Sequence, residues 1–259
     1  MIPTQYSINK QKTKEAFADY VKDYDVKDPK VDLKIRHTYK VAEISEEIAR
    51  TVPKVDKDLA WLVGMMHDIG RFEQLRRYDT FIDAESVDHA SFGCELLYEQ
   101  GLCQKMYDDR GLDDFVRSAI SVHSMYRIPE SVEADVLPYA KILRDADKID
   151  IIRANMETKL EDIYNVTHEE LYHAEVTREV LENFAKKQAT PRALKRTAID
   201  HVVGHISLTY ELEYPKSLSI MKHQGFLTKM MEFPSENPVT RQQFAVIREM
   251  MEDFLETVE

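Results

Sequence analysis

The chain has 259 residues, of which 43% are hydrophobic, and a formal net charge of −12 at pH 7. This length and composition can bury a substantial core, in one large domain or two small ones. The acidic balance argues against general nucleic-acid binding, because that affinity comes from Lys and Arg side chains that neutralise phosphates. An acidic protein can still bind a phosphorylated small molecule where metal ions or a few local cations reverse the charge.

Several common sequence signatures are missing from the chain. No run approaches the roughly 18 apolar residues that span a bilayer, and residues 1–17 lack the continuous apolar segment of a secretory signal. We therefore expect a cytoplasmic protein with no membrane partner. Glycine-rich phosphate loops and the GxSxG nucleophile elbow do not occur. Cys94 and Cys103 lack the spacing of a zinc site, which predicts ordinary reduced cysteines.

Apolar residues recur at intervals of three and four along most of the chain, which predicts an all-α fold. Gly70 is predicted to cap the third helix, Gly101 follows the fourth, and Pro191 can begin the eighth. Residues 214–238 are predicted to be an irregular connection with room for a short helix. The predicted helices cover about 10–24, 32–50, 57–69, 86–100, 112–124, 135–157, 168–187, 191–213 and 239–258.

The second and third predicted helices place ligand-type side chains on their apolar faces. His37 continues the stripe formed by Leu33 and Val41. His67 and Asp68 close the last turn of the third helix, directly after the apolar run LAWLVGMM. A lone inward histidine is commonly a hydrogen-bonded core residue, so His37 by itself indicates little.

The next three predicted helices repeat this pattern. His89 lies one turn before Phe92, and His123 continues the apolar stripe of the fifth helix. Asp147 lies between Leu143 and Ile151 on the sixth helix, which turns a carboxylate inward among apolar side chains. An ionised carboxylate is rarely buried without a partner or a metal ion, so Asp147 requires one.

Five consecutive predicted helices thus each contribute an inward His or Asp. Four imidazoles and two carboxylates suit a divalent first-row metal ion such as iron, manganese, cobalt, nickel or zinc. This set exceeds the needs of one tetrahedral site, which favours two metal ions bridged by one carboxylate. The alternative is that the same side chains form buried salt bridges and hydrogen bonds.

The order His37, His67–Asp68, Asp147 resembles the H…HD…D signature of the HD-domain superfamily of metal-dependent phosphohydrolases. The resemblance covers about residues 32–153. It implies an HD-domain helical bundle, and we expect a single domain over residues 1–259. The helices over about 160–259 would complete the core or form an oligomer surface, which leaves a homo-oligomer open. Four segments extend the match: HDIGR (67–71), HASFG (89–93), AISVH (119–123) and RDADKID (144–150).

The resemblance also implies a set of metal ligands. His37, His67, Asp68 and Asp147 would bind a first divalent ion. Asp68 would bridge to a second ion that His89 and His123 also hold. Members of the family without the two additional histidines use one metal ion, so their presence here favours a dinuclear centre.

Such a centre would hydrolyse a phosphate ester or anhydride, with a nucleotide as the expected substrate, through a metal-bridging hydroxide. Metal-bound water with a pKa of about 7 supplies hydroxide at neutral pH. Arg71 and Lys148 lie where the resemblance places cations that contact the substrate phosphate, and Arg144 is a weaker candidate. Asp68, Arg71 and Lys148 are the predicted catalytic residues. Each cation could instead form a structural ion pair.

Three further functions remain open at this point. The same ligand set occurs in HD-type di-iron oxygenases, which resemble the inositol-cleaving family and activate oxygen at a mixed-valence iron pair. A non-catalytic module that senses a nucleotide would need the same residues, and a purely structural helical protein could also contain them. His201 and His205, in the segment HVVGH, lie on one helical face but lack the Glu of HExxH, so we expect them to be packing or surface residues. The same expectation holds for His168, His173 and His223.

Overall fold

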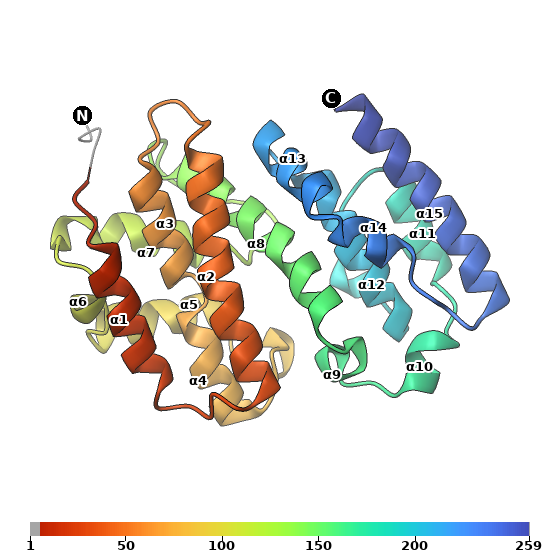
Figure 1. Ribbon diagram of the computed structural model, residues 1–259, viewed down its shortest axis with the longest axis horizontal. Helices are drawn as coiled ribbons and strands as arrows, with labels where there is room; N and C mark the ends of the chain where they lie inside the picture. The colour runs from red at the N-terminus through yellow and green to blue at the C-terminus, as the bar shows by residue number, and fades with distance from the viewer. Residues whose placement is uncertain (1–5, 259) are drawn as a thin grey trace. The chain divides into compact units, whose positions relative to one another are not determined.

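The structure is a computed structural model that describes residues 6–258 (Figure 1). Within these residues the chain forms helices and no β-strand, which confirms the predicted all-α fold. The chain divides into two compact units, one up to Asp147 and the other from Lys148 onward. The expected single domain stays a prediction, because two compact units can belong to one domain. Each unit is described by itself below.

The N-terminal unit begins with α1 (Lys10–Val21), α2 (Pro29–Ala49) and α3 (Lys57–Met66). Helices α2 and α3 pack closely along one another. Gly64 permits this contact, because a Cβ atom at that position would lie 2.6 Å from the Cα atom of Ala42. The close packing of α2 and α3 brings the helix that carries His37 against the helix that ends at His67.

Helix α4 (Ile69–Tyr78) corrects the predicted end of the third helix. Gly70 lies in the first turn of α4 and does not cap α3, which ends at Met66. A Cβ atom on Gly70 would lie 2.3 Å from the carbonyl oxygen of His89 and 2.7 Å from the amide nitrogen of Gly93. Glycine is required here because the α4 backbone touches the α5 backbone. In the sequence, a glycine needed for such a contact looks the same as a glycine that caps a helix.

The remaining helices of the N-terminal unit follow the predictions more closely. Helix α5 begins at His89 and continues as a π-helical turn, and Gly101 follows with a φ of 76°. Helices α7 and α8 correspond to the predicted segments 112–124 and 135–157. The bounds are η1 (Asp83–Glu85), α5 (His89–Cys94), η2 (Glu95–Glu99), α6 (Cys103–Met106), η3 (Arg110–Leu112), α7 (Asp113–Ser121) and α8 (Leu137–Glu157).

The C-terminal unit starts within α8 and continues through shorter helices. Its long final helix, α15, packs on α11 and α14 (Figure 1). Phe244, Ile247 and Met251 of α15 are buried there. The bounds are α9 (Leu160–Tyr164), α10 (His168–Tyr172), α11 (Arg178–Ala185), η4 (Arg192–Leu194), α12 (Ala198–Ser207), η5 (Leu208–Glu211), α13 (Pro215–Gln224), α14 (Phe226–Met231) and α15 (Pro238–Thr257).

Three predicted segments of this unit are wrong in detail. The helix predicted at 168–187 is two helices, since the chain between α10 and α11 leaves the helical path and the Thr177 backbone N–H donates to Asp200. Pro191 precedes a 3₁₀ turn, and α12 starts later, where Thr197 and Asp200 form a capping box. The segment 214–238 holds α13 and α14, separated by Gly225 with a φ of 71°.

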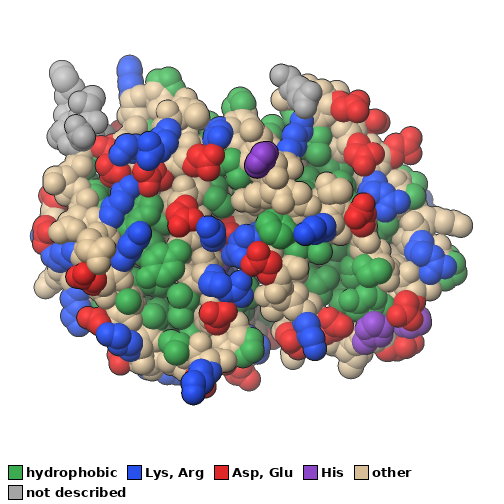
Figure 2. Space-filling view, viewed as in Figure 1, with side chains coloured by type: hydrophobic (Ala, Val, Ile, Leu, Met, Phe, Trp, Pro, Cys, Tyr) green, Lys and Arg blue, Asp and Glu red, His purple; other side chains and the backbone are tan. Residues whose placement is uncertain are grey.

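The surface is charged and mixed. Figure 2 shows acidic and basic side chains interspersed on one face, with apolar side chains between them. None of the helices within residues 6–258 is long and apolar enough to cross a lipid bilayer.

Candidate metal centre

All six residues predicted as metal ligands lie close together in the N-terminal unit. The five from His37 to His123 are each 5% exposed or less. The Asp147 side chain is 18% exposed. They come from α2, the junction of α3 and α4, the start of α5, the turn after α7, and α8. They are His37, His67, Asp68, His89, His123 and Asp147.

Local structure aims these side chains at one point. His67 directly follows the last residue of α3, and Asp68 precedes α4 with φ −108° and ψ 16°, outside the helical region. The Asp68 side chain makes no capping hydrogen bond to α4. Its carboxylate therefore faces the cluster instead of the helix terminus.

One group of ligand-type atoms surrounds the Nε2 atom of His37. This nitrogen lies 3.1 Å from Oδ1 of Asp147, 3.5 Å from Oδ2 of Asp68 and 3.4 Å from Nε2 of His67. Nε2 of His67 also lies 3.5 Å from Oδ2 of Asp68 and 3.8 Å from Oδ1 of Asp147. Two histidines and two carboxylates thus converge on one side of Asp68.

A second group faces the other oxygen of Asp68. Oδ1 of Asp68 lies 3.6 Å from Nε2 of His89 and 3.9 Å from Nε2 of His123. The two Nε2 atoms are 3.0 Å apart. Each carboxylate oxygen of Asp68 therefore faces a different pair of histidines.

Three of the histidines have a defined tautomer. Nδ1 of His67 lies 2.7 Å from the Gly64 carbonyl oxygen, and Nδ1 of His123 lies 2.6 Å from the Ile120 carbonyl oxygen. Nδ1 of His89 lies 2.7 Å from Oδ2 of Asp83. These oxygens only accept hydrogen bonds, so each Nδ1 carries the proton and donates it. Each Nε2 lone pair consequently points into the centre.

The pKa values keep these rings neutral. Burial lowers the pKa of His89 to about 4, and the nearby Arg71 acts in the same direction. Burial also lowers the pKa of His67 and His123. The Nε2 atoms of His89 and His123 therefore lie 3.0 Å apart with no proton to share. Such facing lone pairs fit a cation.

The spacing of the atoms agrees with that fit. Two atoms that each bind one ion at about 2.1 Å lie roughly 3.0 to 4.2 Å apart, depending on the angle between them. His37, His67 and Asp68 form one triad of suitable atoms, and Asp68, His89 and His123 form another.

The carboxylates of the centre are ionised. Burial would raise the pKa of Asp68, but the positive charges of Lys34 and Arg71 outweigh this effect and hold the pKa well below its usual value. Burial also opposes ionisation of Asp147, whose pKa is nevertheless lowered, chiefly by its hydrogen bond with His37. Ionised carboxylates and neutral imidazoles are the ligands that divalent first-row metals accept.

Arg71 lies beside the centre and is held by several acceptors. Its Nη1 donates to the carbonyl oxygen of Phe81 and to the side chains of Gln74 and Asp83, each at 2.7 Å. Its Nε lies 3.6 Å from Oδ1 of Asp68. Within residues 6–258 this buried Nε has no hydrogen-bond partner. One N–H group of Arg71 is thus available next to Asp68.

Two residues near the centre were missed in the sequence. Nζ of Lys34 donates to Oδ2 of Asp68 at 2.7 Å. Asp83 accepts from both His89 and Arg71, and its pKa is lowered because these partners outweigh the effect of burial. Lys34 lies three residues before His37 on the same helical face, which was a usable signal. Asp83 precedes α5 in a loop and left no periodic signal.

The other predicted cations have protein partners. Lys148 directly follows Asp147 in α8, and its Nζ lies 2.9 Å from a carboxylate oxygen of Glu211. Arg144 donates to the carbonyl oxygens of His123 and Tyr126 at 3.3 and 3.2 Å, which supports the turn that carries His123. Catalytic roles for Arg71 and Lys148 stay predictions.

Comparisons with known proteins identify the domain that contains the cluster. The family model of the HD domain matches residues 35–152, a range that includes all six predicted ligands. No curated protein and no solved structure matched the chain. HD domains bind divalent metal ions and are commonly metal-dependent hydrolases. Residues 35–152 of this chain therefore form an HD domain.

Proposed function

We propose that this protein is a metal-dependent phosphohydrolase that cleaves a phosphate ester or anhydride of a nucleotide at a dinuclear metal centre. The observation that supports two ions is the orientation of Asp68, whose two carboxylate oxygens face two different histidine pairs. A carboxylate placed between two ligand sets suits a bridge between two cations.

The proposed ligands divide into two sets that share Asp68. His37, His67, Asp68 and Asp147 would hold one ion, and Asp68, His89 and His123 the other. Iron, manganese, cobalt, nickel and zinc all suit these donors. Bound divalent ions supply hydroxide at neutral pH and offset negative charge on the phosphoryl oxygens.

The surrounding residues orient the ligands. The carbonyl groups of Gly64 and Ile120 accept from His67 and His123, and the Asp83 carboxylate accepts from His89. These hydrogen bonds hold each ring with its Nε2 lone pair inward, so little reorientation is needed for binding. Partners of this kind also raise the basicity of histidine ligands.

Arg71 is the proposed phosphate-binding residue. Asp83 holds its guanidinium, and the free Nε–H can donate to a phosphoryl oxygen. Lys34 adds a second positive charge beside Asp68, which helps an acidic protein accept an anionic substrate. Lys148 is the second proposed catalytic cation. Its ion pair with Glu211 would have to exchange for a substrate contact.

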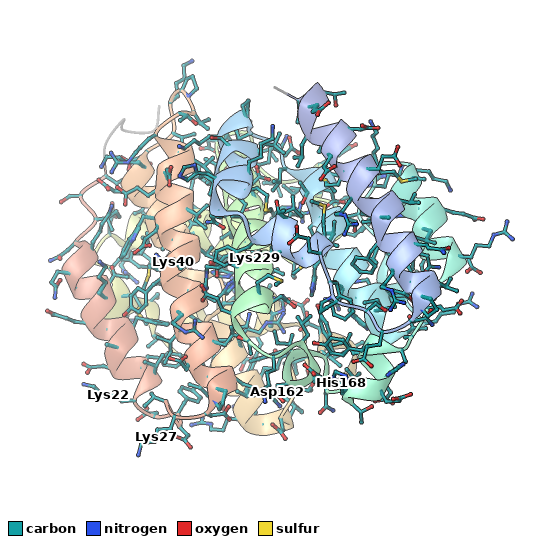
Figure 3. The ribbon with its side chains drawn as sticks, turned by 45° about the vertical axis from the view of Figure 1, so that its right-hand side comes forward. Lys22, Lys27, Lys40, Asp162, His168 and Lys229 are labelled. Atoms are coloured by element: carbon teal, nitrogen blue, oxygen red, sulfur yellow. The ribbon has the colours of Figure 1, made fainter. Side chains whose placement is uncertain are left out.

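The test is a substrate screen on the full chain reconstituted separately with manganese, cobalt, nickel, iron or zinc. The substrates are nucleoside monophosphates, triphosphates, dinucleotides and cyclic nucleotides, and the readouts are released product and bound metal. We expect Asp68→Ala to lose bound metal and turnover. Asp162→Asn, at an exposed residue of the C-terminal unit that Figure 3 labels, should keep both.

The outcomes separate the remaining functions. Unchanged metal content in Asp68→Ala would overturn the dinuclear proposal. Nucleotide binding without product under saturating metal would identify a sensor module. An oxygen-sensitive di-iron signal in anaerobically purified protein, without phosphate release, would identify an oxygenase.

A further inference from the structure

A second group of ionisable side chains lies in the C-terminal unit, around one face of α12. His201 and His205 are four residues apart and share this face with Gly204. The Lys195 side chain lies over Gly204, since a Cβ atom there would be 2.5 Å from both Cε and Nζ of Lys195. Arg192, in η4, completes the group, because its charge acts on Lys195 and on both histidines. We call Arg192, Lys195, His201 and His205 the basic cluster.

A chain of hydrogen bonds sets the tautomer of His205. The Asn155 amide donates to the Ile151 carbonyl oxygen at 2.7 Å, so its own oxygen faces Tyr164. Tyr164 donates its hydroxyl proton to that oxygen at 2.8 Å. The Tyr164 hydroxyl oxygen also lies 2.9 Å from Nδ1 of His205. Because the hydroxyl proton is already donated to Asn155, Nδ1 of His205 carries a proton and donates it to Tyr164. His205 thus turns Nε2 away from this chain.

Tyr164 also holds His201. The two rings stack, with centroids 5.3 Å apart and an angle of 29° between their planes. One tyrosine therefore positions both histidines of the cluster, by stacking on one ring and by a hydrogen bond to the other.

The Asp200 carboxylate lies near the basic cluster and acts to raise the pKa of Lys195 and His201, but it forms no ion pair with either residue. Within residues 6–258 no carboxylate oxygen lies within salt-bridge distance of any of its four members, and Nζ of Lys195 has no hydrogen-bond acceptor there. Asp200 is close in sequence, but its carboxylate already accepts from the backbone N–H groups of Thr177, Arg196 and Thr197. Lys195 and Arg192 are therefore two cations without an ion-pair partner among residues 6–258, in a protein with a net charge of −12.

The pKa values agree with this arrangement. Burial lowers the pKa of Lys195 to about 8, and the charge of Arg192 acts in the same direction. Burial also lowers the pKa of His201 and His205, and the charge of Lys195 lowers both further. A bound anion would stabilise the protonated forms of Lys195, His201 and His205 and so raise their pKa values.

We propose that the basic cluster binds a phosphoryl group of a small-molecule ligand. A phosphoryl group offers several oxygens, which can accept from the Lys195 ammonium and from the fork of the Arg192 guanidinium. Two histidines four residues apart can also hold a metal ion. Here an ammonium group lies over the helical turn between them, and the nearby Asp200 carboxylate is occupied by backbone N–H groups, so the charges favour an anion. This proposal does not depend on the function of the metal centre.

The test uses the full-length protein, loaded with zinc and labelled with ¹⁵N-histidine. Inorganic phosphate is titrated while the imidazole resonances of all nine histidines are followed by NMR. We expect the His201 and His205 signals to shift and saturate. Lys195→Met should weaken this binding roughly tenfold or more, because a charge-assisted contact is lost. Lys229→Met, at an exposed lysine of α14 that Figure 3 labels, should leave it unchanged.

Gly204→Ala gives a second, independent variant. It keeps every charge and the helix tolerates alanine, but the new methyl group displaces the flexible end of Lys195. It should weaken phosphate binding at His201 and His205 as Lys195→Met does. The proposal is overturned if phosphate shifts only the histidines of the metal centre or if Lys195→Met and Gly204→Ala bind as the unchanged protein does. It is also overturned if added zinc or nickel, and not phosphate, moves His201 and His205.

Discussion

The metal centre of the N-terminal unit contains three histidines whose Nδ1 proton is donated to a neighbour, and the basic cluster of the C-terminal unit contains one, His205. In the metal centre the free Nε2 atoms meet two ionised carboxylates. In the basic cluster the histidines lie beside an ammonium and a guanidinium group, and the nearby Asp200 carboxylate accepts from backbone N–H groups. The difference shows that the ligand of a histidine cluster is decided by the charge of its neighbours more than by the imidazoles themselves.

The two sites also differ in what surrounds their glycines. Gly70 lies against backbone atoms of α5, which cannot move aside without shifting the helix. Gly204 lies against the end of a lysine side chain, which has many alternative positions. The metal centre is therefore held by backbone packing, whereas the basic cluster can adjust.

The largest effect is expected from His123→Gln, which breaks one half of the metal centre. We expect bound metal to fall from two equivalents per chain to one. Turnover should fall by more than roughly 100-fold. Mutation of a residue that only orients a metal ligand typically costs roughly 10- to 100-fold, and loss of the ligand itself should cost more. Elemental analysis and initial rates measure both, and His223→Gln, in α13 of the other unit, serves as the control. Retention of two ions in His123→Gln would contradict the shared role of Asp68.

The next effect is the pH dependence of stability in metal-free protein. The pKa of His89 is about 4 in the folded state and about 6.5 when unfolded, so between these values only the unfolded chain takes up the proton. Folding stability should therefore fall as pH drops from 6.5 to 4, by about 3 kcal/mol from His89 alone. Urea unfolding at a series of pH values measures this. His89→Gln should flatten the slope, and an equal slope in both proteins would refute the assignment.

Gly70→Ala and Gly204→Ala compare the two glycine environments directly. Gly70→Ala should lower the free energy of unfolding by about 2 kcal/mol, because the new Cβ atom meets backbone that has to move. Gly204→Ala should keep or raise stability, because alanine favours the helix and only Lys195 has to move. Thermal unfolding of both variants decides the matter. Equal loss in the two would show that the contacts do not differ as described.

Asp83→Asn should weaken metal binding roughly tenfold, within the range for partners that orient a histidine ligand. The amide keeps the size of the side chain but holds the Arg71 cation less firmly and no longer offers a charged acceptor to His89. Metal titration with a competing chelator measures the affinity. Exposed Asp79→Asn is the control, and unchanged affinity in Asp83→Asn would remove Asp83 from the centre.

The smallest effect is expected from Tyr164→Phe. It leaves the Asn155 oxygen and the Nδ1–H of His205 without their shared partner, which costs about 1 kcal/mol of folding stability. The His205 ring should also lose its preference for the Nδ1 tautomer, which ¹⁵N chemical shifts detect. Exposed Tyr78→Phe should change neither quantity. An unaltered tautomer in Tyr164→Phe would show that the hydrogen-bond chain does not set it.

Helical periodicity was enough to predict the all-α fold, and together with the resemblance to the HD domain it predicted that the six residues lie together. His37 and Asp147 continue apolar stripes, so a helix that buries its stripe turns them inward, and the structure leaves His37 2% exposed and the Asp147 side chain 18% exposed. Asp83 could not be predicted in the same way, because its contacts to His89 and Arg71 depend on how a loop returns to the helices. Lys195 lies between η4 and α12, inside the segment predicted as one helix over 191–213, so the predicted helix did not indicate its contact with Gly204.

Glycine and proline signals are ambiguous for a physical reason. In the sequence, Gly70 looks like a helix cap. In the structure, the backbone of α5 occupies the space where a side chain of residue 70 would lie, and the local sequence does not indicate this contact. Pro215 is typical of the boundary of an irregular segment, yet it occupies the first turn of α13, where a proline fits a helix well. The same residue types mark helix ends, helix starts and close contacts, and tertiary structure decides among them.

The contact of Gly70 with His89 and Gly93 has a consequence for metal selectivity. Asp68 lies two residues before Gly70, and His89 is the first residue of α5, so this crossing of two main chains fixes how far the Asp68 carboxylate lies from His89. Contacts between two main chains are much harder to displace than contacts with a side chain, which can change rotamer. A change in preferred ionic radius would therefore require remodelling of the crossing itself. Directed evolution toward a different metal should select changes around residues 70 and 93 before changes in the ligands.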